Sequence, residues 1–306
     1  MKVKVTQLIP GCILQEAVIG KTGKAIIPEQ TIITDEHINI LQKFLITDVH
    51  IFHEMEDGSR FTAKQMEKAE NSSSYNSKSF TKLYNDFVYS YKHQFNIWKV
   101  EQKVDIATLR QTINPLFKRI ERYEIIDLIK QIDSLTISTF YAQQTFSSLF
   151  AFLLAKHMKY NKGELYQIGL ATLLKDSGFI KYSTHYYEQA TKLFLDDYSE
   201  IKQHPVYSYR LVEHSPLLNQ AAKLSILQHE EQIDGKGYPL KLKAADIHRY
   251  AKIIAISAEF TRAFQYFMTK SKSPLIEAVK HIKAEQSKKL DSKFVHIFIN
   301  QLTKNN

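Results

Sequence analysis

The stretch His229-Glu-Glu-Gln-Ile-Asp-Gly-Lys-Gly-Tyr-Pro239 is the most distinctive pattern in this sequence of 306 residues. Glycine adopts positive φ angles without strain and proline ends a turn, so Gly235, Gly237 and Pro239 predict a loop of defined backbone shape. His229, Glu230 and Glu231 precede this loop. The stretch therefore predicts a loop of defined shape after a His-Glu-Glu run.

Two further motifs precede this stretch, and an apolar helix follows it. The motifs are Leu173-Leu-Lys-Asp-Ser-Gly178 and Tyr198-Ser-Glu-Ile-Lys-Gln-His-Pro205, and the helix is expected from Tyr250 to Phe264. Each feature is weak alone, but in this order and spacing they resemble the HD-GYP family, a branch of the helical HD hydrolase superfamily. The resemblance covers residues 140–264.

The resemblance implies a bundle of helices that collects His and Asp side chains around two or three metal ions, usually iron or manganese. It also implies hydrolysis of cyclic di-GMP. Metal ions serve such a reaction by neutralising phosphate oxygens, by lowering the pKa of bound water and by stabilising the leaving alkoxide.

At four positions of the family's metal-binding pattern, this sequence has a residue that can bind a metal ion. Asp176 is the Asp of the family's His-Asp pair, His204 lies in the His-Pro step, and His229 begins the usual His-His-Glu triplet. Glu230 stands where the second His of that triplet is expected and still offers carboxylate oxygens. We therefore expect Asp176, His204, His229 and Glu230 to line the pocket, enough for one metal ion.

Four other positions depart from the family pattern. Lys175 replaces the His of the His-Asp pair, and an ammonium has no lone pair to give to a metal. Gln144 stands where an early helix normally offers a His, and Phe179 replaces a Lys that usually lies beside the metals. Ala258 stands where an Asp is expected, and Glu259 points roughly 100° away around the helix. Because these positions hold Gln144, Lys175, Phe179 and Ala258, we assign no catalytic residue to this chain.

These substitutions predict a damaged metal cluster. We expect no cofactor, and one or two iron or manganese ions if any metal binds. As a hypothesis, Lys175 places its charge where a metal would lie and pairs with the remaining carboxylates, at a desolvation cost.

The loop after the His-Glu-Glu run is the best candidate for a recognition surface. In the family, this loop lies at the mouth of the pocket and is linked to contacts with diguanylate cyclase (GGDEF-type) domains. We expect Lys236 and Tyr238 to be its exposed contacts, one for charge and one for an amphipathic surface. The expected ligand- or partner-binding residues are Asp234, Gly235, Lys236, Gly237, Tyr238 and Pro239.

The sequence predicts a mainly α protein with a small strand-rich (α+β) domain before an HD-GYP-like helical bundle. We expect the first domain at residues 1–53, with a hairpin around Gly20–Gly23, a helix after Thr34 and a closing strand over 46–52. Residues 54–80 are polar and predict a linker. From residue 81 to 306, apolar residues recur at helical spacing.

Composition limits the environment and the partners of the chain. The single cysteine cannot form an intrachain disulfide, and the N-terminal residues lack a secretory pattern, so we expect a cytoplasmic protein. The longest apolar run, Phe146 to Ala155, falls short of the ~20 residues of a membrane helix and predicts a buried helix. The net charge of +9 is dispersed, which disfavours a nucleic-acid surface.

Three functions remain open. The preferred one is a noncatalytic regulatory module in cyclic di-GMP-type signalling, which binds the nucleotide or a signalling protein. The second is a metal-dependent cyclic di-GMP phosphodiesterase with a reduced metal site. The third is a helical dimerisation or assembly protein, and the sequence leaves a homodimer open.

Overall fold

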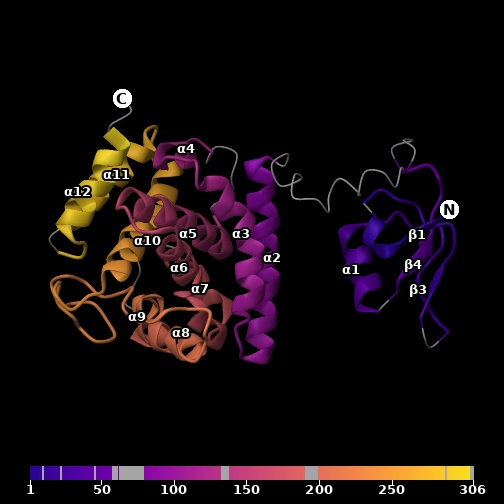
Figure 1. Ribbon diagram of the computed structural model, residues 1–306, viewed down its shortest axis with the longest axis horizontal. Coiled ribbons are helices and arrows are strands. Elements are labelled where there is room, and N and C mark those ends of the chain that lie inside the picture. The colour runs from indigo at the N-terminus through magenta and orange to yellow at the C-terminus, as the bar shows by residue number, and fades with distance from the viewer. Residues whose placement is uncertain are drawn as a thin grey trace. The chain divides into compact units, whose positions relative to one another are not determined.

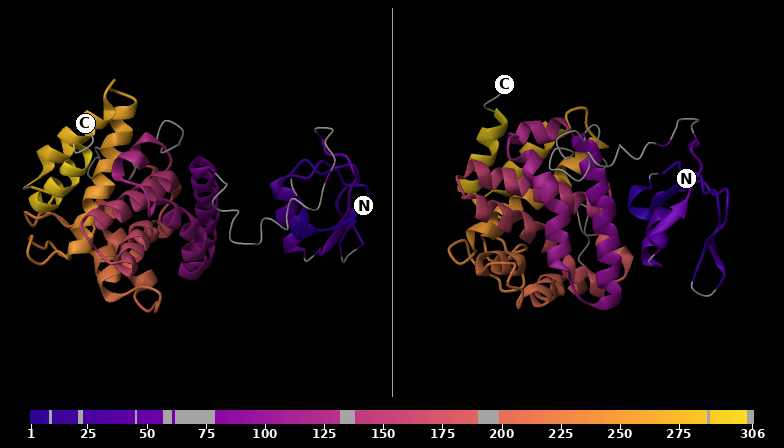
Figure 2. Two further views of the ribbon diagram at one scale, coloured as in Figure 1. Left: turned by 45° about the horizontal axis from the view of Figure 1, so that its top comes forward. Right: turned by 45° about the vertical axis from the view of Figure 1, so that its right-hand side comes forward.

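A computed structural model describes residues 1–8, 10–20, 23–44, 46–56, 61, 79–131, 138–189, 199–286 and 288–303. The chain divides into two compact units, Met1–Ser77 and Lys78–Asn306. The first contains short strands and one α-helix, and the second is helical (Figures 1 and 2). The predicted class, mainly α with a small strand-rich N-terminal part, is confirmed.

The N-terminal unit is built on two short antiparallel strand pairs. Strands β2 (Val18–Ile19) and β3 (Ala25–Ile27) form the predicted hairpin. Strand β1 (Lys2–Lys4) pairs with β4 (Asp48–His50), a long-range pairing that the sequence did not indicate. Helix α1 (Asp35–Lys43) begins after Thr34 as expected, since the Thr34 hydroxyl accepts the His37 backbone N–H at 3.4 Å.

The predicted linker of residues 54–80 lies largely outside the described residues. Its described beginning belongs to the N-terminal unit, because Glu56 N donates to the Gly11 carbonyl at 2.9 Å and Phe61 N to the His53 carbonyl at 2.8 Å. The Phe61 side chain is buried with the core of that unit. The first long helix of the second unit begins at Phe80, the last residue of the predicted linker.

The helical unit surrounds a central helix, α5 (Phe140–His157), in which every residue from Phe140 to Ala155 is buried. The predicted buried helix over Phe146–Ala155 is therefore confirmed. In the part of the chain that the structure describes, no helix is long and apolar enough to span a membrane. The other helices are α2 (Phe80–Glu101), α3 (Ile106–Ile120), α4 (Ile125–Lys130), α6 (Lys162–Leu174), α7 (Thr184–Gln189), α8 (His204–Val212), α9 (Gln220–Leu227), α10 (Arg249–Met268), α11 (Pro274–Glu285) and α12 (Ser292–Thr303).

Aromatic stacking and one glycine set the packing around α5. The Phe150 ring stacks on Phe260 of α10 with centroids 4.6 Å apart, and Phe152 stacks on Phe117 of α3 at 5.0 Å. A Cβ atom at Gly169 of α6 would lie 2.4 Å from the Phe117 ring, so only glycine allows this approach. These contacts fix the helices whose ends carry the candidate site.

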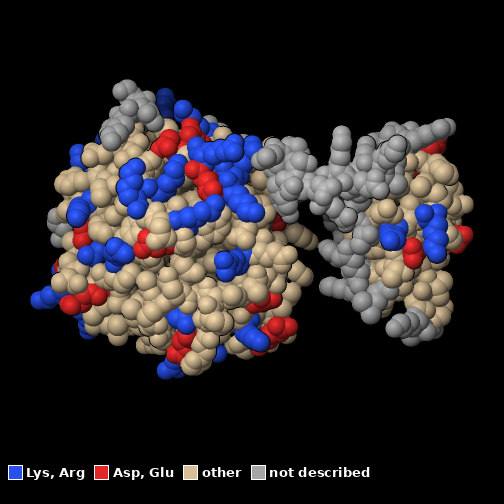
Figure 3. All heavy atoms as spheres, in the orientation of Figure 1, with Lys and Arg blue, Asp and Glu red and all other residues tan. Residues whose placement is uncertain are grey.

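The charged surface agrees with the dispersed pattern of the sequence. Figure 3 shows Lys and Arg side chains over much of the visible face of the helical unit, with Asp and Glu among them. Some of this charge is paired, as between Lys162 and Glu121 at 2.7 Å and between Lys156 and Glu124 at 3.4 Å.

Candidate metal centre

Three chain segments that are distant in sequence bring Asp176, His204 and His229 together. Asp176 follows the end of α6, His204 is the first residue of α8, and His229 follows α9. The end of α6 is held by the Tyr91 hydroxyl, which donates to the Leu173 carbonyl at 2.7 Å. All three site side chains are buried.

Gly178 allows the segment after Asp176 to lie against α8. A Cβ atom there would lie 2.3 Å from the His204 carbonyl oxygen and 2.8 Å from Ser208 N. The Gly178 N–H instead donates to the Ser208 hydroxyl at 2.7 Å, in the short 3₁₀ turn Ser177–Lys181. The Asp-Ser-Gly motif thus places Asp176 against His204. Tyr198, which opens the second sequence motif, lies outside the described residues.

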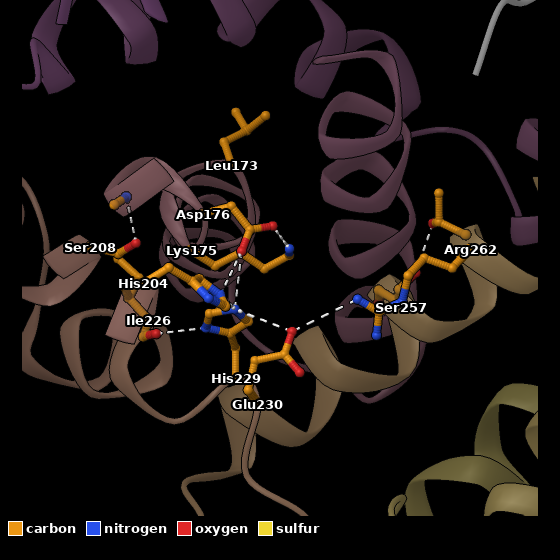
Figure 4. Close-up of polar contacts among 12 residues, drawn as sticks. Leu173, Lys175, Asp176, His204, Ser208, Ile226, His229, Glu230, Ser257 and Arg262 are labelled. Atoms are coloured by element: carbon orange, nitrogen blue, oxygen red, sulfur yellow. Dashed lines mark hydrogen bonds and ion pairs between the residues drawn. The ribbon is translucent and has the colours of Figure 1, made fainter. Parts of the chain in front are cut away.

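The ligand atoms of these three residues form a small triangle. Asp176 Oδ1 lies 3.1 Å from His204 Nε2 and 3.2 Å from His229 Nε2, and the two Nε2 atoms are 3.1 Å apart. Figure 4 shows the three side chains pointing toward one another. In the described part of the chain, they are the one group of His, Cys and acidic residues with metal-ligand spacing.

Backbone hydrogen bonds fix the tautomer of both imidazoles. His204 Nδ1 lies 2.7 Å from the Ile201 carbonyl, and His229 Nδ1 lies 2.8 Å from the Ile226 carbonyl. A carbonyl oxygen only accepts, so each Nδ1 carries the proton and each neutral ring has its lone pair on Nε2. Both lone pairs therefore face the Asp176 carboxylate, the orientation that metal-binding histidines adopt.

The triangle has the right size for one metal ion. Its centre lies about 1.8 Å from each corner, so an ion at the ~2.0–2.2 Å typical of nitrogen and carboxylate ligands fits just above its plane. Two imidazoles and one carboxylate suit iron, manganese or zinc. The residues fit a divalent ion, so the expectation that no cofactor binds does not agree with the structure.

The electrostatics of the triangle favour its metal-binding protonation states. Burial lowers the pKa of His229 below its ordinary value, against the opposing effect of Asp176. Burial opposes ionisation of Asp176, but Lys175, His204 and His229 outweigh it and hold the pKa of this carboxyl well below its usual range. A neutral imidazole and a charged carboxylate are the forms that bind metal.

Lys175 occupies the other side of the Asp176 carboxylate. Its ammonium donates to Asp176 Oδ2 and is buried, whereas Oδ1 faces the two imidazoles (Figure 4). Gln144, Lys175 and Ala258 line one small cavity beside Asp176, so three of the four positions that depart from the family pattern meet in space. In this cavity an ammonium, an amide and a methyl group replace metal ligands.

Glu230 lies at the edge of the triangle and contacts it weakly. Its Oε1 is 3.7 Å from His229 Nε2 and 3.8 Å from Arg262 Nη1. Arg262 also pairs with Glu259 at 2.7 Å, and Glu259 accepts from His281 Nε2 at 2.7 Å. Glu259 is thus engaged with α10 and α11, away from the triangle, as expected from its position on the helix.

Phe179 packs directly on the site. Its ring is fully buried and stacks on the His204 imidazole with centroids 4.5 Å apart and an interplanar angle of 12°. At the position where the resemblance implies a lysine, this chain therefore has a ring that packs on a candidate ligand, His204.

The loop after His229 is held by its own polar groups. Gly235 has a φ of +81°, as predicted, whereas Gly237 does not adopt positive φ. Gly237 is needed for close packing instead, since a Cβ there would lie 2.2 Å from Gln232 N. Asp234 Oδ1 accepts the Lys236 N–H at 3.0 Å, which closes a turn.

The predicted contact residues of this loop differ in exposure. Lys236 is exposed, as expected. Tyr238 is half-buried, with its ring centroid 6.1 Å from that of His204, and burial raises its pKa well above the ordinary value. Tyr238 was expected to be exposed, and the reason for the difference is that the loop folds back onto the site. Pro239, also half-buried, follows it.

Sequence reasoning missed two residues that shape the site. Glu231 is buried and accepts the N–H groups of Leu240 and Leu242 at 2.6 and 2.9 Å, which ties down the loop. Arg262 reaches Glu230 from α10. Its position four residues after Ala258 on one helix face was the signal that could have revealed it.

A helical bundle with a buried Asp-His-His cluster defines the class of this protein as HD-like. Residues 127–294, more than half of the chain, match the HD domain family. The chain therefore belongs to the HD domain family, and the HD-GYP resemblance of the sequence is confirmed.

Two curated relatives and one solved structure are similar to this chain. Cyclic di-GMP phosphodiesterase PdeB of Borreliella burgdorferi is 25% identical over 155 residues, 49% of this chain and 39% of that protein. A cyclic di-GMP phosphodiesterase of Thermotoga maritima is 27% identical over 148 residues, 48% of this chain and 40% of that protein. The chain thus spans about two fifths of the length of these relatives. Bd1817, an HDG"Y"P protein from Bdellovibrio bacteriovorus, shares the fold with a TM-score of 0.57 at 17% identity, covering 99% of both chains.

Proposed function

We propose that this chain is a noncatalytic HD-GYP-like regulatory module that binds a cyclic dinucleotide of the cyclic di-GMP class. One divalent ion at Asp176, His204 and His229 belongs to this proposal, with iron or manganese as the expected metals. The names of the two curated relatives, both cyclic di-GMP phosphodiesterases, support this ligand class.

The cavity beside Asp176 is the observation that carries the noncatalytic part of the proposal. Hydrolysis by two metals needs ligands for both ions, about 3.5–4 Å apart. On the far side of Asp176, the lining positions Gln144 and Ala258 offer no imidazole or carboxylate, and Lys175 brings a positive charge that repels a second cation. A second metal ion is therefore disfavoured on the far side of Asp176, where a two-metal mechanism would need it.

The surviving loop supports a role in recognition. It keeps a turn closed by Asp234 and an exposed lysine, Lys236, and the ring centroid of Tyr238 in the same loop lies 6.1 Å from that of His204. A diguanylate cyclase domain is the proposed protein partner at residues 234–239, and the N-terminal unit is the proposed output.

Cyclic di-GMP binding and turnover by the purified chain test this proposal. Calorimetry should show binding, and chromatography of the nucleotide with added manganese or iron should show no product. Turnover that disappears in Asp176→Ala would overturn the noncatalytic proposal. The matched variant Asp246→Asn changes an acidic residue that is exposed and should leave both readouts unchanged.

The second candidate is a phosphodiesterase with one metal ion, and the Asp176–His204–His229 triangle favours it. A metal ion held there would supply Lewis acidity toward a phosphate oxygen. Asp176 and the two imidazoles would hold it, and the buried surroundings would limit access of bulk water. The same turnover assay decides between this candidate and the first.

A third candidate, an assembly protein without a ligand, predicts a different thermal result. Neither cyclic di-GMP nor manganese should raise its unfolding temperature, because only a ligand of the native state does so. A rise of several degrees with either ligand would count against this candidate.

A further inference from the structure

A small polar cavity lies beside the candidate metal centre, between α5, α10 and the end of α6. It measures about 10 Å³, close to the space that one water molecule or one oxygen atom fills. It is lined by Gln143, Gln144, Ser147, Lys175, Asp176, Ala258, Thr261 and Arg262. Its size excludes a whole phosphate group and admits a single atom of one.

Among the residues that the structure describes, two side chains of the cavity wall each have a buried polar atom without a hydrogen-bond partner. These groups are the Ser147 hydroxyl and the Gln144 amide oxygen, and both residues are more than nine-tenths buried. A buried polar group without a partner costs about 1–3 kcal/mol, so a guest that bonds to it is stabilised. Ser147 can donate its proton, and the Gln144 amide can turn its NH₂ group toward a guest.

The cavity wall offers hydrogen-bond donors to a negative guest. Lys175 pairs with Asp176, and Arg262 pairs with Glu259 at 2.7 Å and lies 3.8 Å from Glu230, so these donors come from ion pairs and not from a net positive charge. Lys175 uses one N–H for Asp176, and an ammonium carries two more. A second metal ion would meet two cations here, whereas an anionic oxygen would meet donors from Lys175 and Ser147.

We propose that this cavity binds one nonbridging oxygen of a phosphate group, with Lys175 and Ser147 as its donors. This proposal rests on the proposed function, because the phosphate is that of the bound cyclic dinucleotide. A second metal ion cannot contact the phosphate in this chain, because the ligands for that ion are missing. Protein side chains then contact the phosphate in its place. Ser147 and Lys175 are binding residues in this proposal and carry out no chemical step.

Ser147→Ala tests the proposal with the smallest change, and Ser148→Ala is its matched control. Ser148 lies on the same helix and is equally buried, but its hydroxyl donates to the Gly169 carbonyl at 2.7 Å, away from the cavity. Lys175→Met is a second variant that removes the charge and keeps most of the volume. Circular dichroism and thermal unfolding confirm that each variant is folded.

Binding is measured by calorimetry with two probes, cyclic di-GMP and inorganic phosphate, on the 306-residue chain with manganese added. Ser147→Ala should weaken the binding of both probes about 3- to 10-fold, as loss of one hydrogen bond does. Lys175→Met should weaken it more than about 10-fold, because a charge-assisted hydrogen bond is lost. Ser148→Ala should bind both probes as the wild type does.

The outcomes separate this proposal from the proposed function. If the wild type, Ser147→Ala and Lys175→Met bind cyclic di-GMP equally, the cavity holds only water and the inference is wrong. The proposed function, binding of a cyclic dinucleotide, then still stands. If inorganic phosphate shows the expected losses and cyclic di-GMP does not bind, the cavity proposal stands and the proposed ligand is wrong. If neither probe binds the wild type, both proposals are wrong.

Discussion

The Nε2 atoms of His204 and His229 lie 3.1 Å apart, and both rings already use their Nδ1 protons on backbone carbonyls. Two neutral imidazoles in this arrangement turn lone pairs toward each other and toward the negatively charged Asp176. Such a contact is unfavourable unless a proton or a metal ion lies between the three groups. The geometry therefore suits a cation at this position, either a proton or a metal ion, although the cluster that the family resemblance implies is incomplete.

His229→Ala should abolish tight manganese binding. The change removes one of three ligands, and since even loss of an outer hydrogen bond to a ligand costs 10- to 100-fold in metal affinity, we expect a loss of more than about 100-fold. Titration calorimetry measures the affinity, and manganese should raise the unfolding temperature of the wild type but not that of His229→Ala. His214→Ala is the control, because this histidine is 93% exposed. Equal manganese affinity in both variants would place the metal elsewhere.

The motifs predicted that Asp176, His204 and His229 lie close together, because each of these residues is positioned by its own segment. Asp176, His204 and His229 each lie at the end of a helix next to a glycine, a proline or a polar turn, and such signals are readable in the sequence. Arg262 was missed because its role depends on Glu230, which approaches from another segment. Tyr238 was placed wrongly because the path of the loop depends on Gly237 packing against residues 230–232.

The fold shows the same division between local and long-range information. The hairpin β2–β3 and the buried helix α5 follow from local patterns of turn residues and apolar residues. The pairing of Val3 with Val49 joins segments far apart in the chain, and nothing in either short segment indicates its partner. Leu116 to Ile129 carries a helical apolar pattern, yet α3 ends at Ile120 and α4 begins at Ile125, because Asp127 accepts the Glu124 N–H at 2.9 Å and starts a new helix.

Phe179→Leu should lower stability and weaken metal binding only slightly. The ring stacks on His204 at 4.5 Å, so its loss should lower the free energy of unfolding by about 1–3 kcal/mol. The Ile201 carbonyl still orients His204, and manganese affinity should fall no more than about 5-fold, less than the loss of a hydrogen bond to a metal-binding imidazole costs. Urea denaturation and calorimetry measure the two effects. Phe152→Leu is the control, because the Phe152 ring stacks on Phe117 with centroids 5.0 Å apart, away from the site. This variant should lower the free energy of unfolding by a similar amount and leave manganese affinity unchanged.

Glu259→Gln should destabilise the fold in a pH-dependent way. Arg262 and His281 outweigh burial and lower the pKa of Glu259 to about 2, against about 4.3 in an unfolded chain. A lowered carboxyl pKa contributes stability that is present above the unfolded value and is lost as pH falls through the folded one. The wild type should therefore exceed Glu259→Gln by about 3 kcal/mol above pH 5, and the difference should shrink toward pH 2.

Urea denaturation at several pH values measures this difference between the wild type and Glu259→Gln. Glu277→Gln is a suitable control, because Glu277 forms an i,i+3 pair with Lys280, whose side chain is 66% exposed. Such surface pairs contribute little, so this variant should differ from the wild type by less than about 1 kcal/mol at any pH. A difference for Glu259→Gln that stays constant from pH 7 to pH 3 would contradict the lowered pKa.

Gly237→Ala should disrupt the loop and, through it, the position of Glu230. The added Cβ would lie 2.4 Å from Glu231 Cα and 2.6 Å from the Glu230 carbonyl oxygen, so backbone atoms must move. We expect a loss of about 2 kcal/mol or more in the free energy of unfolding, because overpacked sites relieve such contacts only by distortion. Gly163→Ala is the control, since its Cβ would meet only the Asn161 side chain, at 3.3 Å, and should change stability by less than about 1 kcal/mol. If Gly237→Ala unfolds at the same urea concentration as the wild type and binds cyclic di-GMP equally, the loop is not held against residues 230–232 as described.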